Sequence, residues 1–200
     1  MSGRDRFYRP IVVINGYMMN TFDPEPSTED LITTFLFFGQ YMKHHMMWPG
    51  NVENTLQVMN MNNQGVAQLP IKKIKAVIGA ITSQNKCVAR NIFVLNAPMA
   101  ISVLYKAVSV ILDQNLKQKV HILNSNTCSA LLELAAPNQI EEKFGGTAPN
   151  KQEGQFWPPS LPDENFGIDE KSVITNVENK YVDINVEEEG AEEDEFQDCV

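Results

Sequence analysis

The sequence predicts an α/β fold in which helices cover a mostly parallel β-sheet. Short runs rich in β-branched residues, which are typical of buried strands, alternate four times with segments whose apolar residues recur at helical spacing. Parallel strands need a long crossover connection, usually a helix, so this alternation favours a parallel sheet. The 200 residues suffice for one domain with a sizeable core and a tail.

The first strand and the first helix have clear boundaries. Residues 11–14 are a β-branched run closed by an Asn-Gly pair, which indicates a buried strand. A helix is expected from Ser27 to about His45, because Ser27 and Asp30 have the spacing of a capping box. The apolar residues of this segment follow helical spacing: Leu31, Phe35, Phe38 and Met42.

Three further units repeat this order of strand and helix. The expected pairs are 55–61 with 69–81, 91–95 with 99–112, and 120–123 with a short helix at about 127–135. Beyond the last unit the chain is rich in Pro, Asn and acids, which marks the end of the regular structure.

The chain divides into a domain and two C-terminal parts. We expect one domain over residues 1–149, a Pro- and Asn-rich extension over 150–182 that packs partly on it, and a disordered acidic tail over 183–200. Residues 183–198 hold nine acids and no base, so the other 16 acids balance the 16 bases. A neutral body without a basic face argues against nucleic-acid binding. The acidic tail could capture a protein partner.

Several features indicate a cytoplasmic protein without catalytic activity. The three cysteines have no metal-like spacing, which fits reduced thiols in the cytosol. No apolar run reaches the ~18 residues of a membrane span, and none follows the N-terminal arginines as in a signal peptide. His44 and His45 are adjacent on a helix and point apart, so we expect no metal site. Phosphate-binding and hydrolase motifs are missing from the sequence, so we expect no enzyme and no cofactor besides a bound ligand.

The segment 99–112 is unusually apolar for a surface helix. Its polar residues Ser102, Lys106 and Ser109 share a stripe roughly 60° wide, whereas a helix on a sheet needs an apolar stripe of only about 100°. The apolar positions include Met99, Ile101, Val103, Leu104, Val108 and Ile111. Either the helix is buried between the sheet and neighbouring helices, or it has the sheet on one side and an apolar ligand on another.

Four sequence blocks carry a resemblance to a known family. They are NIFVLNAP at 91–98, the helix that runs into residues 112–113, KVHILNSN at 119–126 and NQIEEKFGGTAPN at 138–150. In this order and spacing they resemble the CRAL-TRIO domain, a lipid-binding family that includes yeast phosphatidylinositol/phosphatidylcholine transfer proteins, over about residues 10–150. The resemblance implies a sheet that floors a hydrophobic lipid pocket, with residues 99–112 as a movable gate helix. The six apolar residues named above would line that pocket.

The resemblance also implies headgroup residues. Lys119 stands where phosphatidylinositol binders have a lysine, and its ammonium group suits a phosphate. Cys87 occupies the place of the glutamate that those binders pair with this lysine. Thr55 and Gln57 stand where phosphatidylcholine binders have two hydroxyl residues, and side chains two apart on a strand face the same side. These two side chains could hold a headgroup with Lys119, or bond each other or water.

The expected function is non-enzymatic binding, and transfer between membranes, of a hydrophobic ligand. A phospholipid (phosphatidylinositol or phosphatidylcholine) is the first candidate, and the protein would meet membranes transiently from the cytoplasm, in a role in membrane trafficking. One alternative is an adaptor with a vestigial pocket, favoured by Cys87 and by the nine residues before Pro10, too few for the family's N-terminal helical lobe. Another is a carrier of a neutral lipid such as a sterol or an isoprenoid.

Overall fold

A five-stranded sheet and five α-helices make up the part of the chain that the computed structural model describes, residues 3–16, 25–62, 71–84, 88–99, 101–112, 114–152, 155 and 159–167. The strands are β1 (Gly3–Arg4), β2 (Pro10–Asn15), β3 (Thr55–Asn60), β4 (Ala89–Leu95) and β5 (Val120–Ile122). The helices are α1 (Thr28–His45), α2 (Ile71–Gln84), α3 (Ile101–Ser109), α4 (Gln114–Lys117) and α5 (Ser129–Leu134), followed by 3₁₀ helices at Pro137–Gln139 and Glu142–Phe144.

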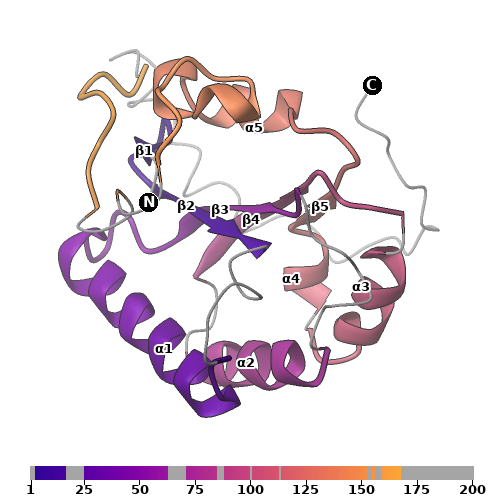
Figure 1. Cartoon of the computed structure of the whole chain (residues 1–200). Helices are drawn as coiled ribbons and strands as arrows, with labels where there is room; N and C mark the ends of the chain where they lie inside the picture. Colours follow the sequence, from indigo (N-terminus) through magenta and orange to yellow (C-terminus); the bar gives the residue numbers. More distant parts are fainter. Residues whose placement is uncertain are drawn as a thin grey trace, which may run out of the picture.

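The sheet confirms the predicted fold class. Its strands lie in the order β1-β2-β3-β4-β5, and all neighbours are parallel except β1 and β2. Because right-handed crossovers between consecutive parallel strands return on the same side, α1, α2 and α3 lie on one side of the sheet. Figure 1 shows these helices below the sheet and α5 above it. We call the side covered by α1, α2 and α3 the helix face, and the other the α5 face.

Local signals set the boundaries of most elements. The Ser27 side chain accepts a hydrogen bond from the Asp30 backbone N at 3.1 Å, and the Asp30 carboxylate accepts one from the Ser27 backbone N at 3.0 Å, which confirms the capping box before α1. Helix α3 is shorter than the predicted 99–112. Beyond Ser109 the chain continues only in i→i+3 bonds, from Ile111 N to Val108 O and from Leu112 N to Ser109 O. β1 and α4 are too short to leave a periodic pattern in the sequence.

The α5 face of the sheet is tightly closed. Side chains from β2, β3 and β4 interlock there with side chains from α5 and the 3₁₀ helices, and most of them are fully buried. The buried members of this core are Ile11, Leu56, Val58, Phe93, Leu95, Cys128, Leu131, Ala135, Ile140 and Phe144. Full burial of each large apolar side chain contributes about 1.5–3 kcal/mol to folding, and this cluster holds the largest set of buried side chains in the described chain.

The Gly145-Gly146 pair explains why the block at 138–150 packs so closely. Gly145 ends the second 3₁₀ helix with φ +87°, a conformation that favours glycine. A Cβ on Gly146 would lie 1.9 Å from the backbone oxygen of Ile140, so only glycine fits there. The close approach lets Glu141 form a parallel bridge with Ala148.

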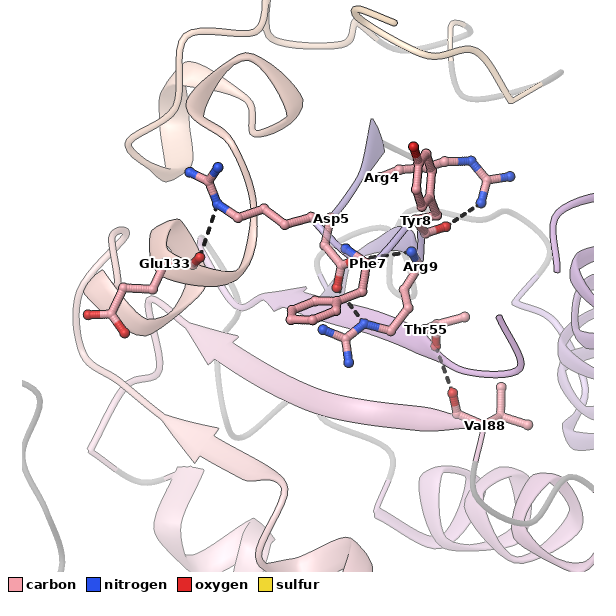
Figure 2. Close-up of polar contacts among 9 residues, drawn as sticks. Arg4, Asp5, Phe7, Tyr8, Arg9, Thr55, Val88 and Glu133 are labelled. Atoms are coloured by element: carbon pink, nitrogen blue, oxygen red, sulfur yellow. Dashed lines mark hydrogen bonds and ion pairs between the residues drawn. The ribbon is translucent and has the colours of Figure 1, made fainter. Parts of the chain in front are cut away.

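A buried ion pair organises the N-terminal hairpin (Figure 2). The fully buried Asp5 carboxylate accepts hydrogen bonds from the backbone N of Phe7 and of Arg9, both at 2.9 Å, and from Arg9 Nε at 2.6 Å. The Arg9 guanidinium also lies over the Phe7 ring, 4.6 Å from its centroid. Burial raises the pKa of Asp5, and the Arg9 charge opposes this rise. The pair holds a turn in which Tyr8 has φ +60°.

Part of the C-terminal extension packs on the body. Gln139 Nε2 donates to the backbone oxygens of Asp163 and Asn165 at 2.9 and 3.0 Å, and Arg6 Nη1 donates to that of Gly167 at 2.6 Å. Cys87, residues 156–158 and the acidic tail 183–200 lie outside the described residues.

His121 on β5 is partly buried against β4. Its ring stacks on Phe93 with 5.0 Å between centroids, and its Nε2 lies 3.1 Å from Asn91 Nδ2. The Asn91 amide N–H can donate to His121 Nε2 in the tautomer that leaves this nitrogen unprotonated. Burial lowers the pKa of His121 below its ordinary value of 6.5.

This arrangement predicts a loss of stability in mild acid. The unfolded chain binds a proton at His121 near pH 6.5, whereas the folded chain binds it only at lower pH. The free energy of unfolding should therefore fall as the pH drops below about 6.5. Urea denaturation of His121→Gln between pH 7.5 and 5 should show a shallower fall than the parent protein, whereas His44→Gln, at an exposed position, should leave it unchanged. Equal pH slopes in all three proteins would remove this role from His121.

Candidate functional site

The helix face of the two central strands is closed much less tightly than the α5 face. On the α5 face, the side chains of β3 and β4 are at most 1% exposed: Leu56, Val58, Phe93 and Leu95. On the helix face, Thr55 and Val94 are buried. Gln57, Met59 and Ile92 on the same face are only partly buried, although β3 and β4 have strands on both sides. Side chains at the centre of a sheet keep solvent access only where the covering helices leave room. The helix face is therefore the candidate binding face.

Two separate apolar clusters border this face. Their buried members are Val12, Met42 and Met46 in the first, which joins β2 to α1, and Met61, Val94, Ala97, Ile101 and Val108 in the second, which joins β4 to α3. Ile14 packs against the first cluster and Met59 against the second, yet these two residues are opposite each other in the β2–β3 register. Among the described residues, the clusters therefore meet along the middle of the helix face without merging into one core.

The inner side of α3 belongs to the second cluster. Ile101 and Val108, two of the residues predicted to line the pocket, are buried and pack in one cluster with Val94. The side chains of Val103 and Leu104, which were predicted to line the same pocket, lie outside the described residues.

The two ends of α3 are exposed instead of lining the sheet. Met99 is 90% exposed before the helix, and Val110 and Ile111 are 81% and 41% exposed after it. The sequence predicts pocket-lining positions for Met99 and Ile111 because it predicts a longer helix. Since α3 runs only from Ile101 to Ser109, both residues fall in the flanking turns and point to the surface.

Thr55 and Gln57 lie together at the start of β3. Gln57 Nε2 donates to Thr55 Oγ1 at 3.3 Å, and Thr55 Oγ1 donates to the backbone oxygen of Val88 at 3.2 Å (Figure 2 shows the second bond). Both side chains therefore share the helix face, as their spacing predicts. Of the two alternatives left open by the sequence, these bonds match the one in which the side chains satisfy each other, with Thr55 fully buried.

Lys119 lies at the same end of the sheet, where the parallel strands begin. It directly precedes β5, and its backbone oxygen accepts a hydrogen bond from the Ile92 backbone N at 2.7 Å. The β4–β5 register pairs Ile92 with Val120, and β3 is one strand further on, so Lys119 is about 10 Å from β3 across two strand spacings. Its side chain is partly buried and forms no ion pair or hydrogen bond with any described residue. Sequence reasoning alone does not reveal this lack of a partner.

A cleft of about 250 Å³ lies at the opposite edge of the sheet from α3. It opens between the N-terminal hairpin and the end of α1, and is lined by Arg4, Tyr8, His45, Met46, Met47, Trp48 and Val52. The sequence did not indicate this cleft, because its walls come from the hairpin and from the loop after α1, which no motif connects.

Metal-ligand groups and membrane-spanning helices are both absent from the described residues. Across the ranges given above, no three His, Cys, Asp or Glu side chains are grouped as metal ligands. Within the same ranges, no helix is both long and apolar enough to cross a bilayer.

Comparisons with known proteins identify the fold. The family model described as "CRAL/TRIO domain" matches residues 1–146. The structure is similar to the crystal structure of Sfh5, a yeast Sec14-like protein, with a TM-score of 0.55 and 14% sequence identity over 84% of this chain. The chain spans 57% of the length of that structure. A search of curated proteins finds no match to the sequence.

The Thr55–Gln57 bond predicts a measurable coupling in stability. Thr55→Val keeps the shape of the side chain but removes the acceptor of the partly exposed Gln57 amide, so it should lower the free energy of unfolding by about 0.5–1.5 kcal/mol. Gln57→Leu made in the Thr55→Val background should cost less than the same change in the parent protein. Urea denaturation of the four proteins checks this, with Thr34→Val, at an exposed site on α1, as the control within about 0.5 kcal/mol of the parent. Strict additivity of the two changes would show that the bond does not stabilise the fold.

Proposed function

The chain belongs to the CRAL/TRIO domain family, and from this premise we propose that it is a carrier that binds a phospholipid on the helix face and exchanges it between membranes. The family supports lipid binding in general. The observation that carries the proposal for this chain is the contrast between the two faces of β3 and β4, of which only the helix face retains partly exposed apolar side chains. Each acyl CH₂ group buried there contributes about 0.8 kcal/mol.

The chemistry of the helix face suits an acyl chain. Met59, Ile14 and Ile92 are flexible or branched apolar side chains, and methionine in particular adapts its shape to irregular ligands. Gln57, near the start of β3, is a polar side chain on this otherwise apolar surface. An acyl chain would lie along the apolar side chains with its polar end toward the edge of the sheet where β3 and β5 begin.

Lys119 is the proposed headgroup residue. An ammonium group with no described partner, about 10 Å across the sheet from the start of β3, suits the phosphate that phosphatidylinositol and phosphatidylcholine share. Thr55 and Gln57 would add hydrogen bonds only by giving up the bond between them. They are therefore proposed as helpers that reorganise on binding.

A neutral ligand is the second candidate, and the same hydrogen bond favours it. The Thr55 hydroxyl already donates to the Val88 backbone oxygen and accepts from Gln57, so the floor presents few free polar groups to a large headgroup. A sterol or an isoprenoid would need only the apolar floor. The two candidates differ in whether Lys119 matters.

The proposed exchange takes place at the cytoplasmic surface of a membrane through α3. Exposed apolar side chains at both of its ends, Met99 and Val110, could enter the bilayer interface while the inner side chains Ile101 and Val108 leave the second cluster. Movement of this helix would open the helix face to a lipid.

Extraction of labelled lipid from vesicles tests the proposal. Delipidated protein is mixed with vesicles of phosphatidylcholine containing labelled phosphatidylinositol, labelled phosphatidylcholine or labelled cholesterol, and the lipid bound to protein is counted after the vesicles are removed. Lys119→Ala should weaken phospholipid binding about ten- to hundredfold, the loss of one charge-assisted hydrogen bond, and leave cholesterol unchanged. Lys117→Ala, two residues away on α4, is the matched control. Pickup of cholesterol alone supports the neutral carrier, and pickup of no lipid contradicts both candidates.

The exposed end of α3 should govern the rate of exchange. Val110→Glu removes an apolar side chain worth about 1.5–3 kcal/mol when buried in the interface, and adds a charge. We expect transfer between vesicles to slow about tenfold or more, while the amount of lipid held at equilibrium stays the same. Phe37→Glu, at an exposed apolar position on α1, should transfer at the parental rate. If both variants slow equally, the effect comes from added negative charge and not from α3.

A further inference from the structure

The cleft beside the N-terminal hairpin combines exposed aromatic rings with a cation. Trp48 is 68% exposed and Tyr8 46%, and both belong to its lining together with Met46, Met47 and Val52. A tryptophan this exposed, grouped with other apolar side chains in the wall of a cleft, is typical of a surface that binds a partner. The cleft lies on the β1 side of the sheet, away from α3, and it shares Met46 with the first apolar cluster that borders the helix face.

Arg4 is the basic side chain in the described lining of this cleft, and Glu53, next to the lining residue Val52, accepts a hydrogen bond from the backbone N of Gly50 at 2.9 Å. Arg4 donates to the backbone oxygens of Tyr8 and Met46 and is partly buried, which leaves some of its five N–H donors for another acceptor. The last turn of α1, which ends at the cleft, carries Lys43, His44 and His45. Among the described residues that line the cleft there is no carboxylate. A partner that fits both properties is a peptide with acidic residues around an aromatic one.

The packed part of the C-terminal extension ends at this cleft. Its Phe166 ring meets the Tyr8 ring edge-on with 5.5 Å between centroids, and the backbone oxygen of Gly167 accepts a hydrogen bond from Arg6 at 2.6 Å. Tyr8 is itself a wall of the cleft. The chain therefore leaves the described part of the structure within reach of this surface.

The sequence that follows has the required chemistry. Residues 183–198 contain nine acids and no base, and Phe196 lies among them. The segment between Gly167 and Asp183 can span about 50 Å when extended. A tether of this kind gives an effective concentration of the order of millimolar, so even weak docking would be populated.

We propose that the acidic segment 183–198 of this chain docks in the cleft between the N-terminal hairpin and the end of α1. Phe196 packs against Tyr8 and Trp48, and the flanking carboxylates face Arg4 and the basic last turn of α1. The docked segment neutralises this corner of the body, and so acts as an autoinhibitory contact against other anionic partners of the same surface.

Paramagnetic relaxation in the full-length protein tests the docking directly. A nitroxide is attached to Cys199 in a Cys87→Ser background, where the other cysteine, Cys128, is buried. The indole N–H signal of Trp48 is identified with Trp157→Phe. We expect the label to remove most of the Trp48 signal at low salt and to leave the backbone N–H of Ile122, on the far strand β5, unaffected. Salt at 0.5 M should restore much of the Trp48 signal.

Variants separate docking from chance encounters. Replacing the nine tail acids by their amides, or Phe196→Ala, cannot disturb a packed core of the described chain, and each should restore the Trp48 signal at low salt. Arg4→Gln should restore it as well, whereas Lys72→Gln, on exposed α2 surface, should not.

Three outcomes would overturn the proposal. The first is equal broadening of Trp48 and Ile122, and the second is broadening of Trp48 that survives both tail variants. The third is broadening of Trp48 in isotope-labelled protein mixed with a spin-labelled but isotope-unlabelled copy, which would show that the tail binds a second molecule instead of its own cleft.

Discussion

β3 and β4 carry apolar side chains on both faces of the sheet, and the two faces are covered in different ways. On the α5 face, short helices press directly onto the strands, and Gly146 permits the close approach. On the helix face, long crossover helices pack mainly at the two margins, as two clusters that do not merge among the described residues. The α5 face supplies most of the stability, which lets the helix face remain incompletely packed without loss of the fold.

Parallel pairing also decides where the polar groups gather. β2, β3, β4 and β5 are parallel and all begin at one end of the sheet. Residues distant in the chain, such as Thr55 and Lys119, therefore come within a few strand spacings of each other. The buried ion pair of Asp5 and Arg9 lies at this end too, because Arg9 directly precedes β2. The helix face thus offers apolar side chains next to polar ones, and membership of the CRAL/TRIO domain family supports lipid binding in general.

Much of the fold follows from local signals in the sequence, because those signals act over a few residues. The capping box of Ser27 and Asp30 and the β-branched run before Asn15 needed no tertiary context. The predicted end of α3 was wrong because the helical spacing of apolar residues continues past Ser109 in the sequence. In the structure the α-helix ends at Ser109, and Val110 and Ile111 are exposed. The hydrogen bond between Thr55 and Gln57 was predicted only as one of two alternatives. The spacing of two residues on a strand shows that both side chains share a face of the sheet, but not which group each one bonds. The exposure of Trp48 in its cleft is a purely tertiary property.

Nuclear Overhauser effects between a bound lipid and the methyl groups of the protein measure directly whether the ligand lies on the helix face. Methyl-labelled protein would be loaded from vesicles of phosphatidylcholine and phosphatidylinositol, and contacts from the acyl chains recorded. We predict contacts with Ile14, Met59 and Ile92, and none with Leu56 or Leu95 on the other side of the same strands. Contacts with Leu56 and Leu95, or bound lipid that contacts none of the helix-face methyls, would contradict this placement.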